Sequence, residues 1–109
     1  MTRHILCTVA ELPEGRSRTF ELNEDTSVVV ARTGERVFAL EDRCSHDDGA
    51  FDDGPVEIDG DRAEIECPRH GGRFDLTNGR ATRMPAIAPI ECFTAGVADG
   101  SVWIDVPEY

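Results

Sequence analysis

The chain has 109 residues, which is enough for one domain with a modest core. It carries 22 acidic residues against 11 basic ones and a net charge of −11, so it lacks the clustered basic side chains that bind nucleic acid phosphates. No apolar run approaches the roughly 20 residues that span a bilayer, and the start has no signal-peptide core. We therefore expect a cytoplasmic protein that binds neither nucleic acid nor a membrane.

Short β patterns recur along the chain, and no apolar period of 3.6 residues persists for the length of a helix. Turn sequences separate the patterns: 33–35, Asp59-Gly60, Asn78-Gly79 and Asp99-Gly100. We expect strands at residues 5–9, 19–22, 28–31, 37–40, 56–58, 63–65, 73–76, 95–98 and 102–106. The sequence thus predicts one all-β domain over residues 1–109, built as an antiparallel sandwich or barrel.

Two short motifs carry residues that bind metals. The first is Cys44-Ser45-His46, and the second, Cys67-Pro68-Arg69-His70, follows after a gap of twenty residues. Each motif offers one thiolate and one imidazole, a set that suits a two-iron cluster with sulfur ligands on one iron and nitrogen ligands on the other. Structural zinc accepts the same ligands, but zinc fingers pair Cys with Cys and place the histidines on a helix. A zinc-stabilised interaction module therefore stays open as the alternative.

The remaining cysteines and histidine lie outside these motifs. Cys7 and Cys92 each occupy an alternating position among apolar residues, so we expect both to be small buried residues in strands. A Cys7–Cys92 disulfide is the alternative. His4, close to the start of the chain, is expected at the surface.

The residues around the motifs resemble the two cluster-binding boxes of Rieske proteins. The segment Cys67–Asp75 follows the pattern C-P-x-H-G-x-x-F-D of the second box, and Cys44-Ser45-His46 is similar to the first. The similarity continues into the strand before the first box, the turn and proline loop after the second, and the last hairpin. It implies one [2Fe-2S] cluster, held by Cys44 and Cys67 on one iron and by His46 and His70 on the other. It also implies small stacked antiparallel sheets with a loop-borne tip formed by residues 43–54 and 66–75, where the histidines face solvent.

Departures from the high-potential Rieske proteins indicate a low potential. Gly49 and Arg69 match the positions of two cysteines that tie the ligand loops together in those proteins. Gly72 and Phe74 match a Ser and a Tyr whose hydroxyls bond to the cluster sulfurs there. Because those bonds stabilise the reduced cluster, their loss predicts a midpoint near roughly −150 mV. Negative charge at Asp47 and Asp48 acts in the same direction, whereas Arg69 and Arg73 oppose it.

The resemblance is closest to the ferredoxin components of bacterial ring-hydroxylating oxygenase systems. It implies an electron carrier, rather than an enzyme, between a flavin-dependent reductase and a terminal oxygenase. An oxygenase would need a second iron held by two histidines and a carboxylate, and only His4 remains for it. We expect a monomer. A tightly bound redox subunit of another oxidoreductase, such as a nitrite or arsenite enzyme, is the alternative.

We expect the docking surface to surround the histidine tip. Ala50, Phe51, Met84 and Pro85 are candidates for an apolar patch there, with packing of Phe51 against the sheet as the alternative. A ring of acidic residues should surround the tip and make electron transfer slower at higher ionic strength: Asp47, Asp48, Asp52 and Asp53.

Overall fold

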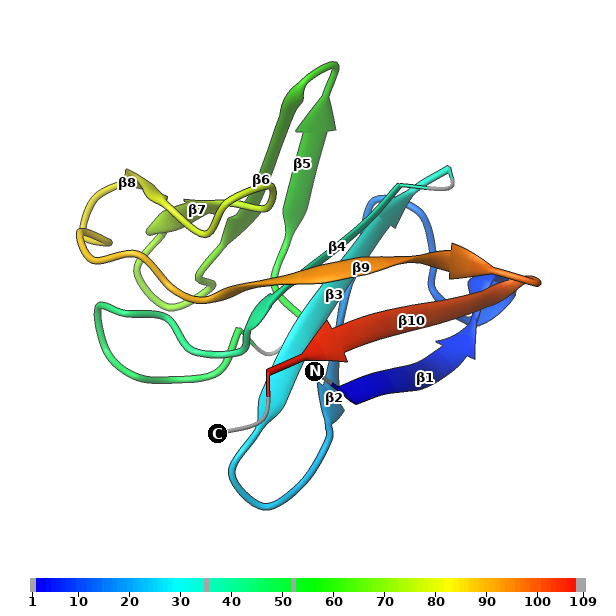
Figure 1. The fold of residues 1–109 in the computed structure, drawn as a ribbon. Helices are drawn as coiled ribbons and strands as arrows, with labels where there is room; N and C mark the ends of the chain where they lie inside the picture. Colours follow the sequence, from blue (N-terminus) through cyan, green and yellow to red (C-terminus); the bar gives the residue numbers. More distant parts are fainter. Residues whose placement is uncertain (1, 35, 52, 108–109) are drawn as a thin grey trace.

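A computed structural model describes residues 2–34, 36–51 and 53–107, whose strands form two antiparallel sheets (Figure 1). The larger sheet has the order β1-β10-β9-β4-β3-β2, with bounds Thr2–Thr8, Ser101–Val106, Cys92–Ala98, Arg36–Glu41, Ser27–Thr33 and Ser17–Glu21. The smaller sheet runs β5-β6-β7-β8, with bounds Val56–Asp59, Arg62–Glu66, Arg73–Asp75 and Ala81–Arg83. Within the described ranges the single helical element is the 3₁₀ turn η1 (Val9–Glu11). The all-β prediction is confirmed.

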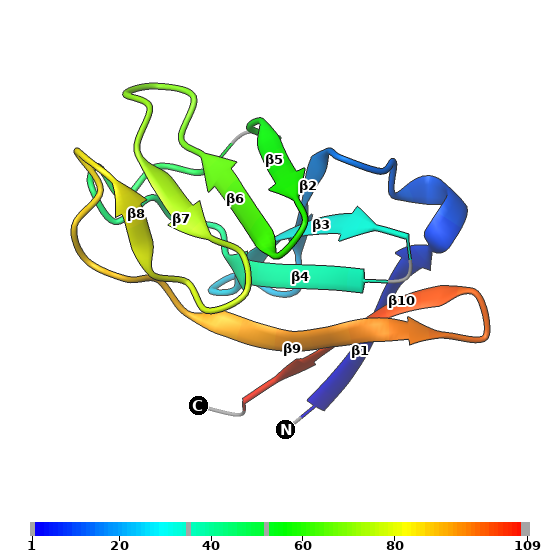
Figure 2. The same ribbon diagram turned by 90° about the horizontal axis from the view of Figure 1, so that it is seen from above.

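The hairpin β3–β4 forms a layer shared by two cores. Val28 and Val30 of β3 face one core, while Val29 and Ala31 face the other, because side chains alternate along a strand. The predicted buried strand at 28–31 is therefore buried on both faces, and all four residues are fully buried. One core fills the curled larger sheet, and the other lies between β3–β4 and the smaller sheet (Figure 2).

Glycine lies in the predicted turns, although one turn is shifted by a residue. Asp59 is the last residue of β5 and pairs with Arg62, so Gly60, with φ 62°, is the first central residue of the β5–β6 turn. Asp99 and Gly100 are the two central residues between β9 and β10, with φ 51° and 74°. Positive φ at both central residues gives a turn whose twist matches the flanking strands, a conformation that Asp-Gly adopts readily. Gly79 also has positive φ, at 79°. Glu35, the last residue of the predicted 33–35 turn, lies outside the described residues.

Three loops gather at one end of the molecule, on the left in Figure 1: residues 43–51, 67–72 and 84–91. The hydroxyl of Ser45 donates a hydrogen bond to the carbonyl of Ala88 at 2.5 Å, which joins the first loop to the third. Gly72 of the second loop lies so close to the third that an added Cβ would be 3.1 Å from the Cβ of Ala86. Both predicted metal motifs therefore lie on loops at the same end of a sheet scaffold.

The prediction for Cys92 is wrong. The strand β9 begins at Cys92 and buries Phe93, so the side chain of Cys92 lies on the exposed face. Ile90, which suggested the opposite alternation, belongs to the loop before the strand and is buried in the core under the smaller sheet. Cys7 is half-buried, and both thiols are free, so the alternative of a Cys7–Cys92 disulfide is wrong as well. The short strand β8 was not predicted.

Candidate functional site

The four predicted ligands form an inner and an outer pair. Cys44 and Cys67 are buried, and their Sγ atoms lie within 4.8 Å of each other. His46 and His70 are exposed, with ring centroids 5.0 Å apart and ring planes at 80°. Burial and the neighbouring Cys67 raise the pKa of the Cys44 thiol. Metal binding must therefore displace a proton from this thiol.

The two ligand loops have the same backbone design. The N–H of Cys44 donates to the carbonyl of Gly49 at 2.8 Å, and the N–H of Cys67 donates to Gly72 at 2.7 Å. Each cysteine carbonyl in turn accepts a hydrogen bond from the residue four positions later, which is Asp48 or Gly71. Asp48 and Gly71 have positive φ, at 60° and 77°, a conformation that Gly and Asp tolerate better than most residues. Each loop thus closes around its own cysteine and leaves the histidine at its outer side.

Two of the three described aspartates of the acidic ring are paired with arginines. Asp47 forms an ion pair with Arg69 at 2.6 Å, and Asp48 pairs with Arg43 at 2.8 Å. Hydrogen bonds from Arg69 hold the pKa of Asp47 well below its usual range. Asp53 accepts a hydrogen bond from the N–H of Thr19 at 3.1 Å, and Asp52 lies outside the described residues. The tip therefore carries less net negative charge than the sequence alone suggested.

Asp47 lies near all four candidate ligands, which raises the question of whether its carboxylate is itself a ligand. Its oxygen lies within 4.8 Å of the ligand atoms of both cysteines in one group and of both histidines in another. Both carboxylate oxygens, however, already accept hydrogen bonds from Arg69, and Oδ1 also accepts from the N–H of Gly49. Oδ2 also lies 3.6 Å from Nδ1 of His70, so the carboxylate stands beside the imidazole pair. The two thiols and two imidazoles themselves fit a group with two sulfur and two nitrogen ligands.

Two phenylalanines support the ligand loops from below. Phe51 and Phe74 are fully buried and meet edge to face, with ring centroids 5.6 Å apart. The prediction of Phe51 as part of an exposed patch is wrong, and the alternative that it packs against the sheet is confirmed.

Met84 and Ile87 of the third loop are exposed by 75% and 77%. Ile87 was not singled out in the sequence because an isolated apolar residue in a loop gives no periodic signal.

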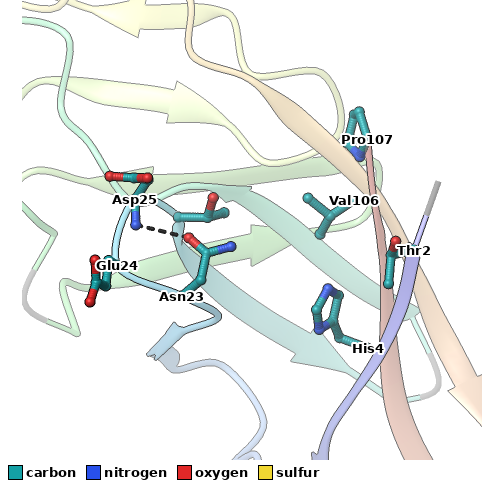
Figure 3. A pocket seen from close by; sticks show the side chains of 8 residues that line it. Thr2, His4, Asn23, Glu24, Asp25, Val106 and Pro107 are labelled. Atoms are coloured by element: carbon teal, nitrogen blue, oxygen red, sulfur yellow. Dashed lines mark hydrogen bonds between the residues drawn. The ribbon is translucent and has the colours of Figure 1, made fainter. Parts of the chain in front are cut away.

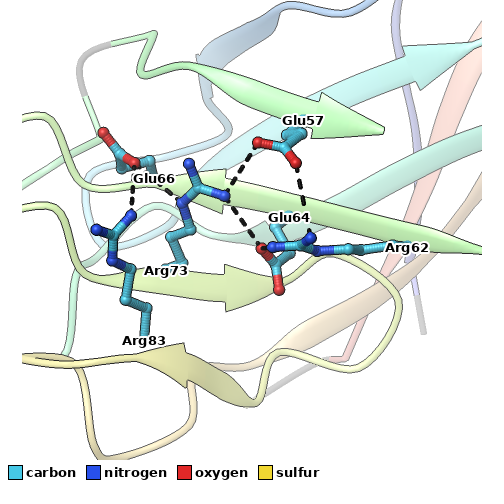
Figure 4. Close-up of polar contacts among 6 residues, drawn as sticks. All are labelled: Glu57, Arg62, Glu64, Glu66, Arg73 and Arg83. Atoms are coloured by element: carbon cyan, nitrogen blue, oxygen red, sulfur yellow. Dashed lines mark hydrogen bonds and ion pairs between the residues drawn. The ribbon is translucent and has the colours of Figure 1, made fainter. Parts of the chain in front are cut away.

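An ion-pair network covers the outer face of the smaller sheet (Figure 4). Arg73 lies at its centre, with Glu66 at 2.9 Å, Glu57 at 3.1 Å and Glu64 at 3.4 Å. Arg62 and Arg83 extend the network at either side. Although burial raises the pKa of Glu64, hydrogen bonds from Arg62, Thr82 and Arg73 outweigh it and hold that pKa below its ordinary value. Arg73 thus belongs to the scaffold, and its charge is compensated away from the ligands.

An open pocket lies away from the ligand loops, between β1, the β2–β3 turn and the end of β10 (Figure 3). Its lining includes His4, which is half-buried there, and contains no residue of loops 43–51 or 67–72. The carboxamide of Asn23 accepts a hydrogen bond from the N–H of Asp25 at 2.8 Å and shapes the turn.

No helix in the described part of the chain has the length and apolar character needed to cross a membrane.

Comparison with protein families matches residues 2–94 to the Rieske [2Fe-2S] domain. The chain belongs to the Rieske [2Fe-2S] domain family. This membership implies that the domain binds a [2Fe-2S] cluster, and the cysteine and histidine groups at the tip agree with it.

Relatives of this Rieske domain include ferredoxin subunits of dioxygenases. It is 38% identical over 110 residues to the 3-phenylpropionate/cinnamic acid dioxygenase ferredoxin subunit of Shigella flexneri serotype 5b, with 99% of this chain and 97% of the relative covered. Its fold matches the ferredoxin of carbazole 1,9a-dioxygenase from Nocardioides aromaticivorans with a TM-score of 0.85 and 30% identity, covering 95% and 97% of the two chains. A complex of reduced oxygenase and oxidized ferredoxin in carbazole 1,9a-dioxygenase matches with a TM-score of 0.81 and 29% identity, covering 94% and 91%.

Proposed function

We propose that this protein is a one-electron carrier of low potential that passes electrons from a flavin-dependent ferredoxin reductase to a terminal oxygenase. Cys44, Cys67, His46 and His70 would hold its single [2Fe-2S] cluster, which supplies reversible one-electron chemistry when bound. The protein is then an electron-transfer component, not the enzyme of its system. The likeness to dioxygenase ferredoxin subunits over nearly the whole chain supports this role.

The observation that carries the proposal is the arrangement of a buried thiol pair beneath an exposed imidazole pair. Burial of Cys44 and Cys67 keeps water away from the thiolates, and exposure of His46 and His70 leaves a path by which a partner can approach. Neutral imidazoles in place of two thiolates reduce the negative charge of the site and ease its reduction. An arrangement with one open side suits a shuttle that docks with one partner and then another.

The residues around the ligands support a potential at the low end of the Rieske range, near roughly −150 mV. Gly72 and Phe74 carry no hydroxyl, and Phe74 is fully buried against Phe51. The charges that we expected to compete are each paired, Asp47 with Arg69 and Arg73 with glutamates. The absence of hydroxyl donors therefore becomes the main reason for a low potential.

Docking with the oxygenase would use the tip and the third loop beside it. Met84 and Ile87 are exposed and lie on the loop that is hydrogen bonded to Ser45 and packed on Gly72. An exposed apolar pair on a loop joined to both ligand loops provides contact area that becomes buried on association. Replacement of Ile87 by Ser should weaken electron transfer to an oxygenase while the midpoint potential stays unchanged.

The ligand assignment is tested by spectroscopy on purified variants. We expect a rhombic EPR signal from the dithionite-reduced protein, with two irons and two sulfides per chain. Cys44→Ser and Cys67→Ser should lose the signal and the iron, whereas Cys7→Ser and Cys92→Ser are matched controls that should retain both. His46→Ala and His70→Ala should likewise lose the signal and the iron, and His4→Ala is their control, which should retain both. Zinc in place of iron in the wild-type protein would overturn the proposal in favour of a zinc-stabilised module.

The role in electron transfer is tested with an acceptor. The reduced protein should be reoxidised in the presence of the oxygenase of a 3-phenylpropionate/cinnamic acid dioxygenase, at a rate that rises with oxygenase concentration. The apo form serves as the control. If the natural protein elutes from size-exclusion columns only with other subunits and reduces no separate oxygenase, it is a bound subunit of another oxidoreductase.

A further inference from the structure

The side chain of Arg69 crosses from the second ligand loop to the first. Its Nε and one terminal nitrogen donate to the two carboxylate oxygens of Asp47, at 2.6 Å and 3.0 Å. The other terminal nitrogen donates to the carbonyl of Ala50 at 2.5 Å. Arg69 stands next to His70 and Asp47 stands next to His46, so this bidentate pair joins the loops immediately beside both histidines.

Gly49 leaves the space in which the guanidinium lies. A Cβ built on Gly49 would be 2.6 Å from a terminal nitrogen of Arg69 and 2.7 Å from its Cζ. The backbone of Gly49 has no positive φ, so its conformation is open to other residues and the need for glycine is one of space. Any larger residue at this position would push the guanidinium away from Asp47, since a flexible side chain moves more easily than the backbone.

The pair is also well oriented on both sides. Asp47 is fixed by a hydrogen bond from the N–H of Gly49 to its Oδ1 at 3.0 Å, and its side chain is 22% exposed against 31% for Arg69. Bidentate arginine–carboxylate pairs of this kind hold a defined geometry, unlike a single flexible contact. No disulfide spans the two loops, because the cysteines at positions 44 and 67 are both free.

We propose that Asp47, Arg69 and Gly49 form a non-covalent clamp that holds the two ligand loops together and slows release of the cluster. The proposal rests on the proposed function in that the cluster is the group released. The clamp residues position the ligands and are not ligands themselves. The clamp predicts that removing either charged partner speeds cluster release, even though the two substitutions change the local charge in opposite directions.

Three variants separate the clamp from the charge. Asp47→Asn and Arg69→Gln each break the pair, and we expect each to speed cluster release about fivefold, the factor that a well-formed ion pair near the surface is worth. Gly49→Ala keeps both charges and displaces the guanidinium, so it should speed release to a similar extent. In the Arg69→Gln background Gly49→Ala should add little, since the guanidinium that it displaces is gone. Release is followed as loss of visible absorption in the presence of an iron chelator.

The midpoint potential is the second readout, and it distinguishes positioning from electrostatics. Loss of the positive charge in Arg69→Gln should lower the potential, loss of the negative charge in Asp47→Asn should raise it, and Gly49→Ala should leave it near that of the wild-type protein. A purely electrostatic role would instead make the release rates of the two charge variants move in opposite directions, which would overturn the clamp.

Two results separate failure of the clamp from failure of the proposed function. A wild-type protein without the rhombic EPR signal contradicts the proposed function. A wild-type protein with a normal signal, whose variants Asp47→Asn and Arg69→Gln release the cluster at the wild-type rate, contradicts the clamp alone. Should Gly49→Ala fail to fold, Arg69→Lys replaces the double-variant comparison. Lysine keeps the positive charge but lacks the planar guanidinium that donates two hydrogen bonds to Asp47, so this variant should release the cluster faster than the wild-type protein.

Discussion

Glu66 and Arg73 face each other as register partners of β6 and β7, and their side chains form an ion pair with 2.9 Å between Oε1 and Nε. These two residues flank the loop that carries Cys67 and His70, since Glu66 precedes Cys67 and Arg73 follows Gly72. Backbone pairing of β6 with β7 and the ion pair between the two side chains therefore both close the second ligand loop at these residues. The strand pairing and the ion pair thus hold the two ends of the loop together.

Substitution of Arg73 should destabilise the domain more than substitution of Arg83. Arg73 is 19% exposed and serves three glutamates, whereas Arg83 is 61% exposed and lies 3.9 Å from Glu66. We expect Arg73→Gln to cost about 1–2 kcal/mol, because it leaves the mostly buried Glu64 and its neighbours with fewer partners. Arg83→Gln is the matched control and should cost less than about 0.5 kcal/mol.

The comparison uses the apparent melting temperature of the cluster-loaded protein at a fixed scan rate. A loss of about 1–2 kcal/mol corresponds to roughly 5–15 °C for a domain of this size. Equal melting temperatures for the two variants would show that the network in Figure 4 is a solvated surface with no role in holding the loop.

Gly79 should tolerate no side chain. Its φ is 79°, and a Cβ there would collide with the carbonyl oxygen of Ile90, whose N–H donates to the Gly79 carbonyl at 2.9 Å. We expect Gly79→Ala to cost about 3 kcal/mol from backbone strain and overpacking together. Gly100 has a similar φ of 74° but open space around it, so Gly100→Ala should cost only the strain, about 1 kcal/mol. Similar melting temperatures for the two variants would contradict the close approach at Ile90.

The motif spacing and strand periodicity predicted much of this structure because they depend on local chemistry. The hairpin of β5 and β6 follows from a glycine, Gly60, between two alternating segments. Val28–Ala31 is predicted as a buried strand because its residues are apolar on both faces. The four candidate ligands lie together because each motif follows the end of a strand, β4 or β6, at the same end of the scaffold. The assignment of these four residues as cluster ligands stays a prediction.

Features that depend on contacts between distant segments could not be read in this way. The ring of aspartates was counted as exposed charge, yet its pairing with Arg43 and Arg69 depends on how the loops fold. The side of β9 on which Cys92 lies depends on where the strand begins, and a shift of one residue reverses the faces. The burial of Phe51 follows from Phe74 beneath it, on a strand more than twenty residues away.

A hydroxyl at position 72 should raise the midpoint potential. Gly72 has no side-chain donor, and we expect it to match a Ser in the high-potential Rieske proteins. We expect Gly72→Ser to raise the potential by roughly 60 mV, which corresponds to one charge-assisted hydrogen bond of about 1.5 kcal/mol. Gly72→Ala is the control, since both variants meet the same contact, a Cβ 3.1 Å from that of Ala86. Redox titrations that give the same potential for both variants would mean that the hydroxyl does not reach the cluster.

Cys92 should react with alkylating reagents, and its reactivity should rise at higher pH than that of an ordinary cysteine. The residue is exposed, but its Sγ faces the carbonyl of Thr77 at 3.5 Å. Partial burial of the thiol and the negative charge of Asp75 raise its pKa above the ordinary value of 9.0. A raised pKa means that less thiolate is present at any pH below it, and the thiolate is the nucleophile.

Iodoacetamide labelling of the cluster-loaded Cys7→Ser protein between pH 7 and 10, read by mass spectrometry, isolates this thiol. The labelling rate should still be rising at pH 9. In Asp75→Asn the rise should move to lower pH but stay above that of a free cysteine, because burial of the thiol remains when the charge is removed. Cys44 and Cys67 serve as internal references, since both are buried and should stay unlabelled while the cluster is held. Labelling of Cys92 that levels off below pH 9 would contradict the raised pKa, and no labelling of it at all would contradict its place on the outer face of β9.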